Sequence, residues 1–173
     1  PLKVLNPLLT ATQEKNFKGT EGFAAMPFQG VILAHSNESE WLSFRNNKTN
    51  EAFLDRVYIV KVPYCQRVDE EVQIYRKMLA NSALKNAPCA PRTLDVLAQF
   101  TVLSRLVVPE NSSLYVKLRV YNGENLKDTD PSAKTVAEYR EAAGNQEGMT
   151  GISTRWAFKV ISTVFDRDPN ETA

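Results

Sequence analysis

Asn37, Arg56 and Arg155 are polar residues that stand beside apolar stretches of the sequence. An asparagine amide offers two donor hydrogens and an acceptor oxygen, so it can hold a phosphate oxygen or orient a water molecule. A guanidinium stays charged, and its planar fork of N–H groups matches the oxygens of a phosphate. These residue types are therefore suited to binding an anion such as a phosphoryl group, provided that the surrounding elements bring them to a ligand.

Asn37 lies just beyond a predicted strand at residues 31–35. The strand is apolar at its first four positions, which is typical of a parallel strand that is covered on both faces. Ligands of such sheets bind outside the carboxyl ends of the strands. Asn37 could therefore hold a phosphate oxygen or orient the attacking water. The alternative is a turn residue whose side chain bonds its own backbone, and position alone favours this second interpretation.

Arg56 immediately precedes a second predicted strand, residues 57–62, which is rich in β-branched residues. This position belongs to the opposite edge of the sheet from Asn37. An arginine there could reach a ligand on a neighbouring subunit more easily than one on its own chain. The alternative is an ion pair with Asp55 or Glu51, which contributes little to stability when it is exposed.

Arg155 belongs to a predicted helix at about residues 151–165. On a helical wheel it shares one face with Lys159 and Ser162. Apolar residues cover most of the remaining circumference: Trp156, Ala157, Val160, Ile161 and Val164. A helix that is buried on most sides and carries a narrow cationic stripe suits a lid over an anion. The alternative is a solvated stripe on a surface helix.

Helical periodicity replaces the strand pattern after residue 63. Two further helices are predicted to begin near Asp69, where acids occupy the first turn, and near Thr93; a third begins at Pro131. The first should bury Val68, Val72, Tyr75 and Leu79, and the second Val96, Phe100, Leu103 and Val107. Between the second and the third, alternating apolar residues predict a strand over 114–121.

The composition narrows the functional classes. The chain has 173 residues and a formal net charge of +1, so a general attraction to nucleic acid or anionic lipid is not supported. No apolar stretch approaches the roughly 20 residues of a membrane span. Two cysteines, Cys65 and Cys89, lack metal-type spacing and are expected to be reduced thiols of a cytoplasmic protein.

Several catalytic signatures are missing from the sequence. One histidine, His35, and no serine elbow argue against a hydrolytic triad. No metal-ligand cluster is visible, so no metal-binding residue is predicted. The phosphate-binding signature GxxxxGK(S/T) does not occur either.

Five stretches of sequence carry a resemblance to a known family. They are "ILAHSNESEW", "FRNNKTNEAFLDRVYIVKVPYC", "NAPCAP", "NGENLKDTDP" and "GMTGISTRWAFK". Together they resemble the ATPase region of the PrkA-type serine protein kinases, which belong to the AAA+ class of P-loop ATPases. The resemblance covers nearly the whole chain.

The resemblance implies an α/β fold in two parts. Residues 1–64 would form the C-terminal part of a partial AAA+ parallel-sheet core, and residues 65–173 a mostly helical lid. The phosphate-binding loop and the acidic motif that holds Mg²⁺ would lie upstream, and a kinase-like region downstream. We therefore expect the chain to be a slice of a larger protein.

The resemblance also implies a role for each of the three polar residues. Asn37 resembles the sensor-1 residue, which orients the attacking water or contacts the γ-phosphate. Arg56 resembles the arginine finger that points at ATP bound by the next protomer, although Arg45 is a nearby competitor. Arg155 resembles sensor 2 on the lid helix. Phosphoryl transfer depends on such positioning and charge neutralisation more than on covalent chemistry.

The parent protein is accordingly expected to bind and hydrolyse ATP and to phosphorylate protein substrates. ATP and Mg²⁺ would be bound mainly by parts outside this chain. The expected partners are neighbouring protomers of a homo-oligomer and a protein substrate, with no nucleic acid and no membrane. Two rival functions are an ATP-driven remodelling or protease-like module without kinase activity, and a non-enzymatic interaction domain.

The missing phosphate-binding loop generates a prediction about this chain by itself. We expect it to bind Mg-ATP weakly and to hydrolyse none, because sensor and finger residues act on a nucleotide that other residues hold. Calorimetric titration of the 173-residue chain with Mg-ATP measures this directly. Micromolar binding would contradict the expectation.

Overall fold

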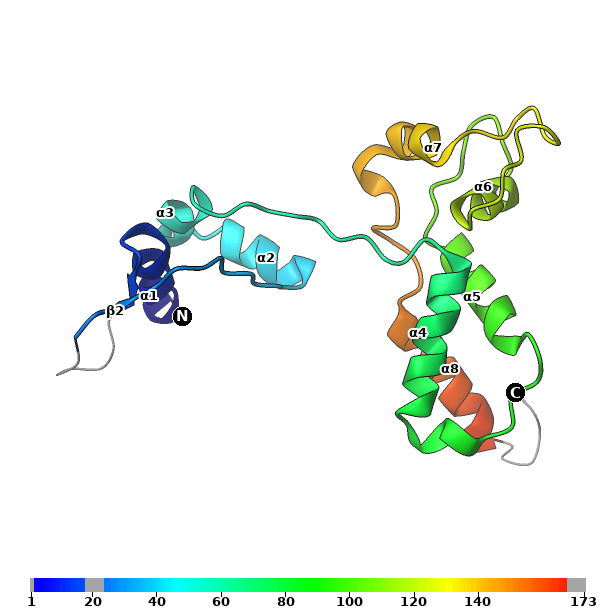
Figure 1. Ribbon diagram of the computed structural model, residues 1–173, viewed down its shortest axis with the longest axis horizontal. Coiled ribbons are helices and arrows are strands. Elements are labelled where there is room, and N and C mark those ends of the chain that lie inside the picture. Colours follow the sequence, from blue (N-terminus) through cyan, green and yellow to red (C-terminus); the bar gives the residue numbers. More distant parts are fainter. Residues whose placement is uncertain (1, 18–23, 168–173) are drawn as a thin grey trace. The chain divides into compact units, whose positions relative to one another are not determined.

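The computed structural model describes residues 2–17 and 24–167 (Figure 1). The chain forms two compact units, Pro1–Val60 and Lys61–Ala173, each with its own packing. We expected a parallel-sheet core followed by a mostly helical part, and the structure contains the helical part. The sheet found in the described residues is a small two-stranded antiparallel one, and a parallel-sheet core is not formed there.

The first unit is built from short elements. Its elements are α1 (Leu2–Gln13), β1 (Asn16–Phe17), β2 (Met26–Pro27), α2 (Glu38–Arg45), the 3-10 turn η1 (Lys48–Asn50) and α3 (Glu51–Leu54). Phe44 of α2 packs against Phe53 of α3, and Trp41 stacks on Phe44 within α2. The ring centroid of Phe44 lies 6.0 Å from that of Trp41 and 5.5 Å from that of Phe53.

The predicted strands at residues 31–35 and 57–62 are wrong for the described structure, in which neither segment has regular secondary structure. A strand requires hydrogen-bond partners on a neighbouring strand, and the described residues provide none to these segments. Most of their apolar side chains are consequently exposed: Leu33 is 93% exposed and Tyr58 92%. The sequence has the composition of buried strands without the sheet that would bury them.

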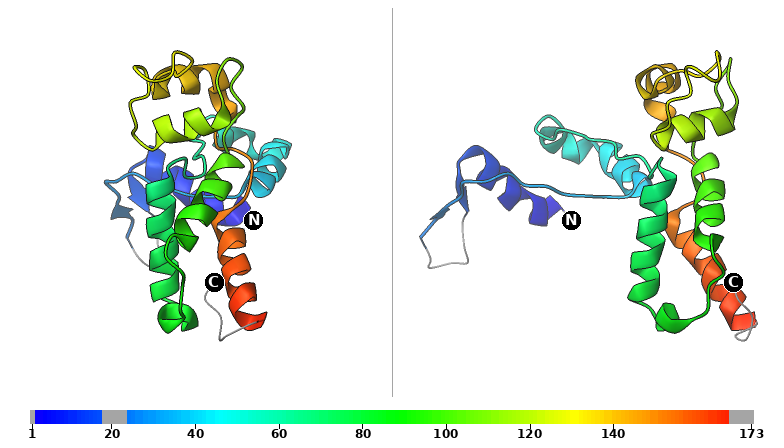
Figure 2. Two further views of the ribbon diagram at one scale, coloured as in Figure 1. Left: turned by 90° about the vertical axis from the view of Figure 1, so that its right-hand side faces the viewer. Right: turned by 45° about the vertical axis from the view of Figure 1, so that its right-hand side comes forward.

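The second unit is helical. Its elements are α4 (Val68–Ala80), η2 (Ala83–Asn86), α5 (Thr93–Leu103), α6 (Leu114–Tyr121), α7 (Val136–Ala143), η3 (Gly144–Gln146) and α8 (Thr154–Arg167). Helices α4, α5 and α8 pack side by side, and α6 and α7 pack together at the other end of the same unit (Figures 1 and 2). The core of this unit lies where α4, α5 and α6 meet.

The stripe predicted for α4 is confirmed at Val68, Val72 and Tyr75, which are buried, whereas its fourth member, Leu79, is partly exposed. The face predicted for α5 is wrong. Val96 and Phe100 are exposed, whereas Ala98 and Val102 are fully buried. The helix is apolar around most of its circumference, so periodicity does not select a face.

The predicted strand at Leu114–Tyr121 is wrong as well, since these residues form α6. The oxygen of the Ser113 side chain accepts a hydrogen bond from the amide of Val116 and caps the helix. Lys117, Leu118 and Tyr121 are buried on one helical face. The helix predicted to begin at Pro131 begins five residues later, after a capping box between Thr135 and Glu138.

Helix α8 is less buried than its sequence suggests. Ala157, Ile161 and Phe165, spaced four residues apart, form the buried stripe. Trp156 and Val164 were predicted to be covered, but they are 51% and 46% exposed. None of the helices in the described part of the chain has the length and apolar composition that a bilayer crossing requires.

Candidate functional site

Asn37 is the N-cap of α2. Its side-chain oxygen accepts hydrogen bonds from the amide of Glu40, at 2.8 Å, and from the hydroxyl of Ser39, at 2.9 Å. This helix was not predicted, because residues 36–49 were interpreted as a polar segment. The capping geometry agrees with the interpretation of Asn37 as a residue that bonds its local backbone, and it leaves the side-chain nitrogen as the group suited to a ligand oxygen.

Arg56 follows α3 and is exposed. Its guanidinium donates to the carbonyl oxygen of Ala52, one helical turn earlier. Arg45, the competitor for the role of arginine finger, occupies the last turn of α2 in the same unit and is exposed too. Neither arginine is buried in an ion pair, so both side chains can reorient toward an external anion.

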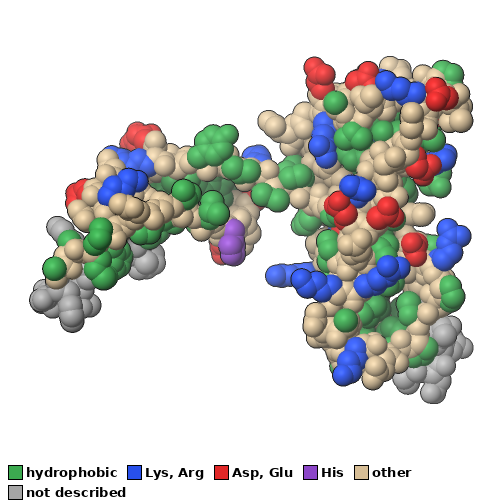
Figure 3. Space-filling model, in the orientation of Figure 1, with side chains coloured by type: hydrophobic (Ala, Val, Ile, Leu, Met, Phe, Trp, Pro, Cys, Tyr) green, Lys and Arg blue, Asp and Glu red, His purple; other side chains and the backbone are tan. Residues whose placement is uncertain are grey.

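Arg155 is the second residue of α8 and its side chain is exposed. It belongs to the unit Lys61–Ala173, whereas Asn37 and Arg56 belong to Pro1–Val60. The approach of all three residues to one ligand therefore stays a prediction. On the face shown in Figure 3, positive and negative side chains are interspersed, in keeping with the net charge of +1.

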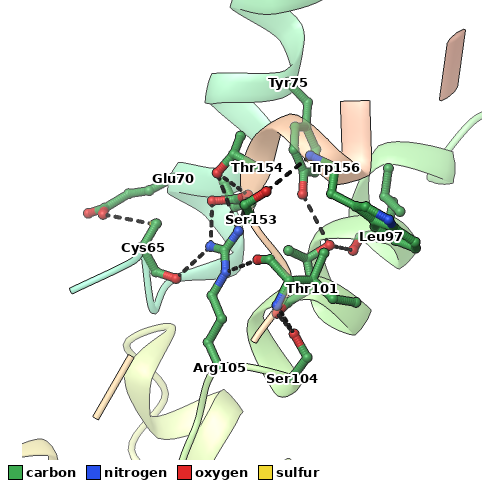
Figure 4. A network of polar contacts seen from close by, with 12 residues as sticks. Cys65, Glu70, Tyr75, Leu97, Thr101, Ser104, Arg105, Ser153, Thr154 and Trp156 are labelled. Carbon is green, nitrogen blue, oxygen red and sulfur yellow. Dashed lines mark hydrogen bonds and ion pairs between the residues drawn. The ribbon is translucent and has the colours of Figure 1, made fainter. Parts of the chain in front are cut away.

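A buried ion pair lies directly beneath the first turn of α8 (Figure 4). Arg105, which follows α5, donates from its two terminal nitrogens to the two carboxylate oxygens of Glu71 on α4, at 2.9 and 2.8 Å. Both side chains are 0% exposed. A bidentate pair of this kind combines charge with fixed geometry, so it sets how α4 and α5 meet.

Arg105 also bonds the segments on either side of the pair. It donates to the carbonyl oxygens of Cys65, at 2.9 Å, and Ile152, at 2.8 Å. Its backbone carbonyl accepts a hydrogen bond from the amide of Gly148. One arginine thus fixes the segment that enters α4 and the segment that enters α8.

Gly151 allows the second of these segments to pass close to α5. Its φ of +98° lies in the region that favours glycine, and a Cβ there would overlap the backbone carbonyl of Ser104. The amide of Ile152 then donates to the Ser104 hydroxyl at 3.0 Å. The chain therefore enters α8 along a route that only glycine permits.

The charges of the network follow from its contacts. Burial alone would raise the pKa of Glu71, but hydrogen bonds from Arg105 and Thr154, with the positive charge of Arg105, hold that pKa below its usual 4.5. Burial raises the pKa of the nearby Cys65 thiol. Glu71 is thus ionised and Cys65 protonated at neutral pH.

A second buried pair ties α6 to the segment before α8. The amine of Lys117 donates to Glu147 at 2.6 Å and to the carbonyl oxygen of Val107 at 2.8 Å. It also lies 5.6 Å from the ring centroids of Tyr121 and Tyr139. Glu147 is next to Gly148, so the two buried pairs hold adjoining parts of one loop.

Neither buried pair was anticipated from the sequence, although one signal was present. Glu71 falls between Val68, Val72 and Tyr75 on the apolar stripe of α4, where a charged residue must be paired to be buried. Its partner, 34 residues away, could not be identified from spacing. Among the described residues, no group of three side chains of the metal-binding types gathers into a candidate metal site.

Comparison with known proteins identifies the class of the chain. Residues 1–113 match the family model of the PrkA AAA domain, and residues 115–173 match that of the PrkA serine protein kinase C-terminal domain. The first match covers more than half of the chain. The chain therefore belongs to the PrkA family, as its sequence motifs indicated.

Two relatives illustrate the similarity. The chain is 66% identical over all 173 residues to the serine/threonine kinase YeaG of Escherichia coli K12. It is 40% identical over 172 residues to the ATP-dependent protease PrkA of Bacillus subtilis 168. In both comparisons the chain spans 27% of the length of the relative. No solved structure gave a significant match.

The two family matches meet inside the second structural unit. Glu71 and Arg105 lie in the part matched by the AAA domain, and Thr154 lies in the part matched by the C-terminal domain. The hydroxyl of Thr154 donates to Glu71 at 2.9 Å. The buried network therefore joins residues of both matched segments into one packed body.

Glu71→Gln tests the energetic importance of this network. Removing the charge of one partner of a buried ion pair should lower the free energy of unfolding by roughly 3–5 kcal/mol at neutral pH. Because the pKa of Glu71 is lowered in the folded state, its contribution is complete above 4.5 and is lost as the pH falls through the folded value. The difference between wild type and Glu71→Gln should therefore shrink in acid, as measured by urea denaturation at a series of pH values.

Glu70→Gln is the matched control. Glu70 is the preceding residue, and it pairs with Arg67 at 3.3 Å with both side chains about half exposed. Its replacement should change the unfolding free energy by less than about 1 kcal/mol at any pH. Equal losses in the two variants would show that the buried pair is not the stabilising contact.

Proposed function

We propose that this chain supplies the sensor and arginine-finger residues of an AAA+ ATPase module, in a parent protein that binds and hydrolyses ATP and phosphorylates protein substrates. The observation that carries the proposal is the match of residues 1–113, which include Asn37 and Arg56, to the PrkA AAA domain. Arg155 lies in the part matched by the PrkA C-terminal domain, so its proposed role rests on the resemblance of its sequence motif. The 66% identity to a protein named as a serine/threonine kinase supports the kinase part.

Asn37 would act as sensor 1 through its side-chain nitrogen. Its oxygen already accepts the capping hydrogen bonds of α2, so the amide group is held in a defined orientation. The nitrogen could then donate to the γ-phosphate. A neutral donor fixed in this way adds hydrogen bonding at the site without adding charge.

Arg56 would act as the arginine finger and Arg155 as sensor 2. Both are exposed, as residues must be if they contact a nucleotide that the rest of the protein holds. A finger supplied to the neighbouring protomer implies a homo-oligomer. Arg155 on α8 would contact the γ-phosphate, and loss of that phosphate would release the helix.

The segments without regular secondary structure at residues 31–35 and 57–62 support the same assignment. They are rich in apolar and β-branched residues, and several of these side chains are largely exposed, as shown by Val31 at 87% and Val62 at 80%. Solvent-exposed apolar strands of this kind are unfavourable unless other strands cover them. In the proposed module they would complete a parallel sheet, with Asn37 beyond the carboxyl end of the first strand.

The cofactors would be ATP and Mg²⁺. The chain contributes donors to phosphate oxygens but no phosphate-binding loop, and its described residues hold no carboxylate cluster for a cation. Mg²⁺ neutralises charge that develops on the transferring phosphoryl group. The residues that hold the metal would lie outside this chain.

An ATP-dependent protease or remodelling activity is the second candidate. The 40% identity to a relative named as an ATP-dependent protease favours it specifically. Both candidates use the same ATPase module, so the three polar residues would serve either one.

Alanine substitutions in the full-length protein test the ATPase assignment. Asn37→Ala should reduce ATP turnover by roughly 10²- to 10³-fold, as loss of an oriented donor does elsewhere. Arg56→Ala should reduce it by roughly 10³- to 10⁵-fold. Turnover of the Arg56 variant should recover in part when it is mixed with protomers that lack only ATP binding, because the finger acts on the next subunit.

Two further variants complete this experiment. Arg45→Ala identifies the finger if it, rather than Arg56→Ala, abolishes turnover. Arg119→Ala is the control, because this exposed arginine pairs with Glu124 at 2.7 Å within the second unit and should be dispensable. Normal turnover in all three of the variants Asn37→Ala, Arg56→Ala and Arg155→Ala, with folding preserved, would favour the non-enzymatic interaction domain.

Radiolabel transfer separates kinase from protease. The full-length protein with γ-labelled ATP and a casein-type protein substrate should incorporate label if it is a kinase, because the phosphoryl group moves to a hydroxyl. A protease should instead yield ATP-dependent fragments without label. Gel electrophoresis with autoradiography reads both outcomes, and the Asn37→Ala protein should lose whichever activity is present.

A further inference from the structure

The first residue of α8 is linked to the buried ion pair. The hydroxyl of Thr154 donates to a carboxylate oxygen of Glu71 at 2.9 Å and accepts from a terminal nitrogen of Arg105 at 3.3 Å. Figure 4 shows this hydroxyl directed at the guanidinium of Arg105. A hydroxyl with a bonded donor and a bonded acceptor has a fixed orientation, so the first turn of α8 is fixed with it.

The two charges of the pair are matched to each other without this hydroxyl. Arg105 and Glu71 already make two charge-assisted hydrogen bonds to each other, at 2.9 and 2.8 Å. The hydroxyl is not needed to cap α8 either, because the side-chain oxygen of Ser153 accepts from the amide of Trp156 and caps the helix. Besides stabilising the buried carboxylate, Thr154 therefore ties the start of α8 to the pair, and this link is not required for capping.

The hydrogen bonds of Thr154 also determine the position of the next residue, Arg155. Its Cα lies one peptide unit, about 3.8 Å, from that of Thr154. Its side chain is exposed, and no partner inside the unit is needed to explain its position. The direction in which its guanidinium can reach is thus determined by where the backbone of the first turn is held.

We propose that Thr154, together with Glu71 and Arg105, forms a positioning set for Arg155, holding the start of α8 so that the guanidinium of Arg155 meets the γ-phosphate of ATP. This inference rests on the proposed function of Arg155 as sensor 2. It adds that the preference of Arg155 for ATP over ADP depends on the buried pair of Glu71 and Arg105. The pair acts by holding the start of α8 in place and does not itself contact the nucleotide.

Four variants of the full-length protein test the proposal: Thr154→Val, Thr154→Ser, Arg155→Ala and the double variant Thr154→Val/Arg155→Ala. Valine keeps the shape of threonine and removes the hydroxyl, whereas serine keeps the hydroxyl. Fluorescence or calorimetric titration gives the Kd for ADP and for a non-hydrolysable ATP analogue. The ratio of the two constants reports the γ-phosphate contact, and a general loss of folding would not change it selectively.

We expect Arg155→Ala to weaken binding of the ATP analogue by roughly tenfold or more, as expected for a lost charge-assisted hydrogen bond, with little change for ADP. Thr154→Val should show the same selectivity at about three- to tenfold, and Thr154→Ser should resemble wild type. The double variant should be no weaker than Arg155→Ala alone, because Thr154 acts only through Arg155.

The outcomes separate the two proposals. If Arg155→Ala binds both nucleotides normally, Arg155 is not sensor 2, and the positioning role fails with it. If Arg155→Ala is selective but Thr154→Val is normal, or if the two losses add, only the positioning role is overturned. Thr154→Ala, which removes the hydroxyl without a β-branch, replaces the valine variant if that variant does not fold.

Discussion

In the second unit, the meeting of α4, α5 and the start of α8 depends on one buried contact, the bidentate pair between Arg105 and Glu71. A charge removed from water is tolerated only when its partner and its remaining hydrogen bonds are in place. Arg105 meets that condition by bonding the carboxylate of Glu71 and the carbonyl oxygens of Cys65 and Ile152. Because all of these contacts must form together, the arrangement of α4, α5 and the start of α8 is specified as one set rather than helix by helix.

Sequence patterns predicted this unit where one face of an element is apolar and the other polar. The stripe Val68–Val72–Tyr75 of α4 was found for that reason. Prediction failed for α5, whose apolar residues surround the helix, and for α6, where alternation suggested a strand. In α6 a helical face buries Lys117 beside Leu118, and the lysine is tolerated because Glu147 pairs with it. Such pairs join residues distant in sequence, and local periodicity contains no information about them.

The candidate site, too, could be predicted from the sequence only in part. The residue types Asn37, Arg56 and Arg155 could be selected from the sequence because their chemistry suits phosphate. Their surroundings could not, since Asn37 follows a segment that has the composition of a strand yet lacks strand partners among the described residues. The residue composition of a segment reflects the degree of burial and packing in which that segment is stable. Leu33 and Tyr58 have the composition of buried strand residues but are exposed in the described structure.

The location of the buried pair bears on how an ATPase module and the segment after it can influence each other. Arg105 and Glu71 belong to the part that matches the AAA domain, and α8 belongs to the part that matches the C-terminal domain. A packed interior has discrete arrangements and does not deform continuously. If Arg155 senses the γ-phosphate as proposed, its release cannot remain confined to one side chain. It would reach Thr154 and, through the Thr154 hydroxyl, the buried pair of Glu71 and Arg105.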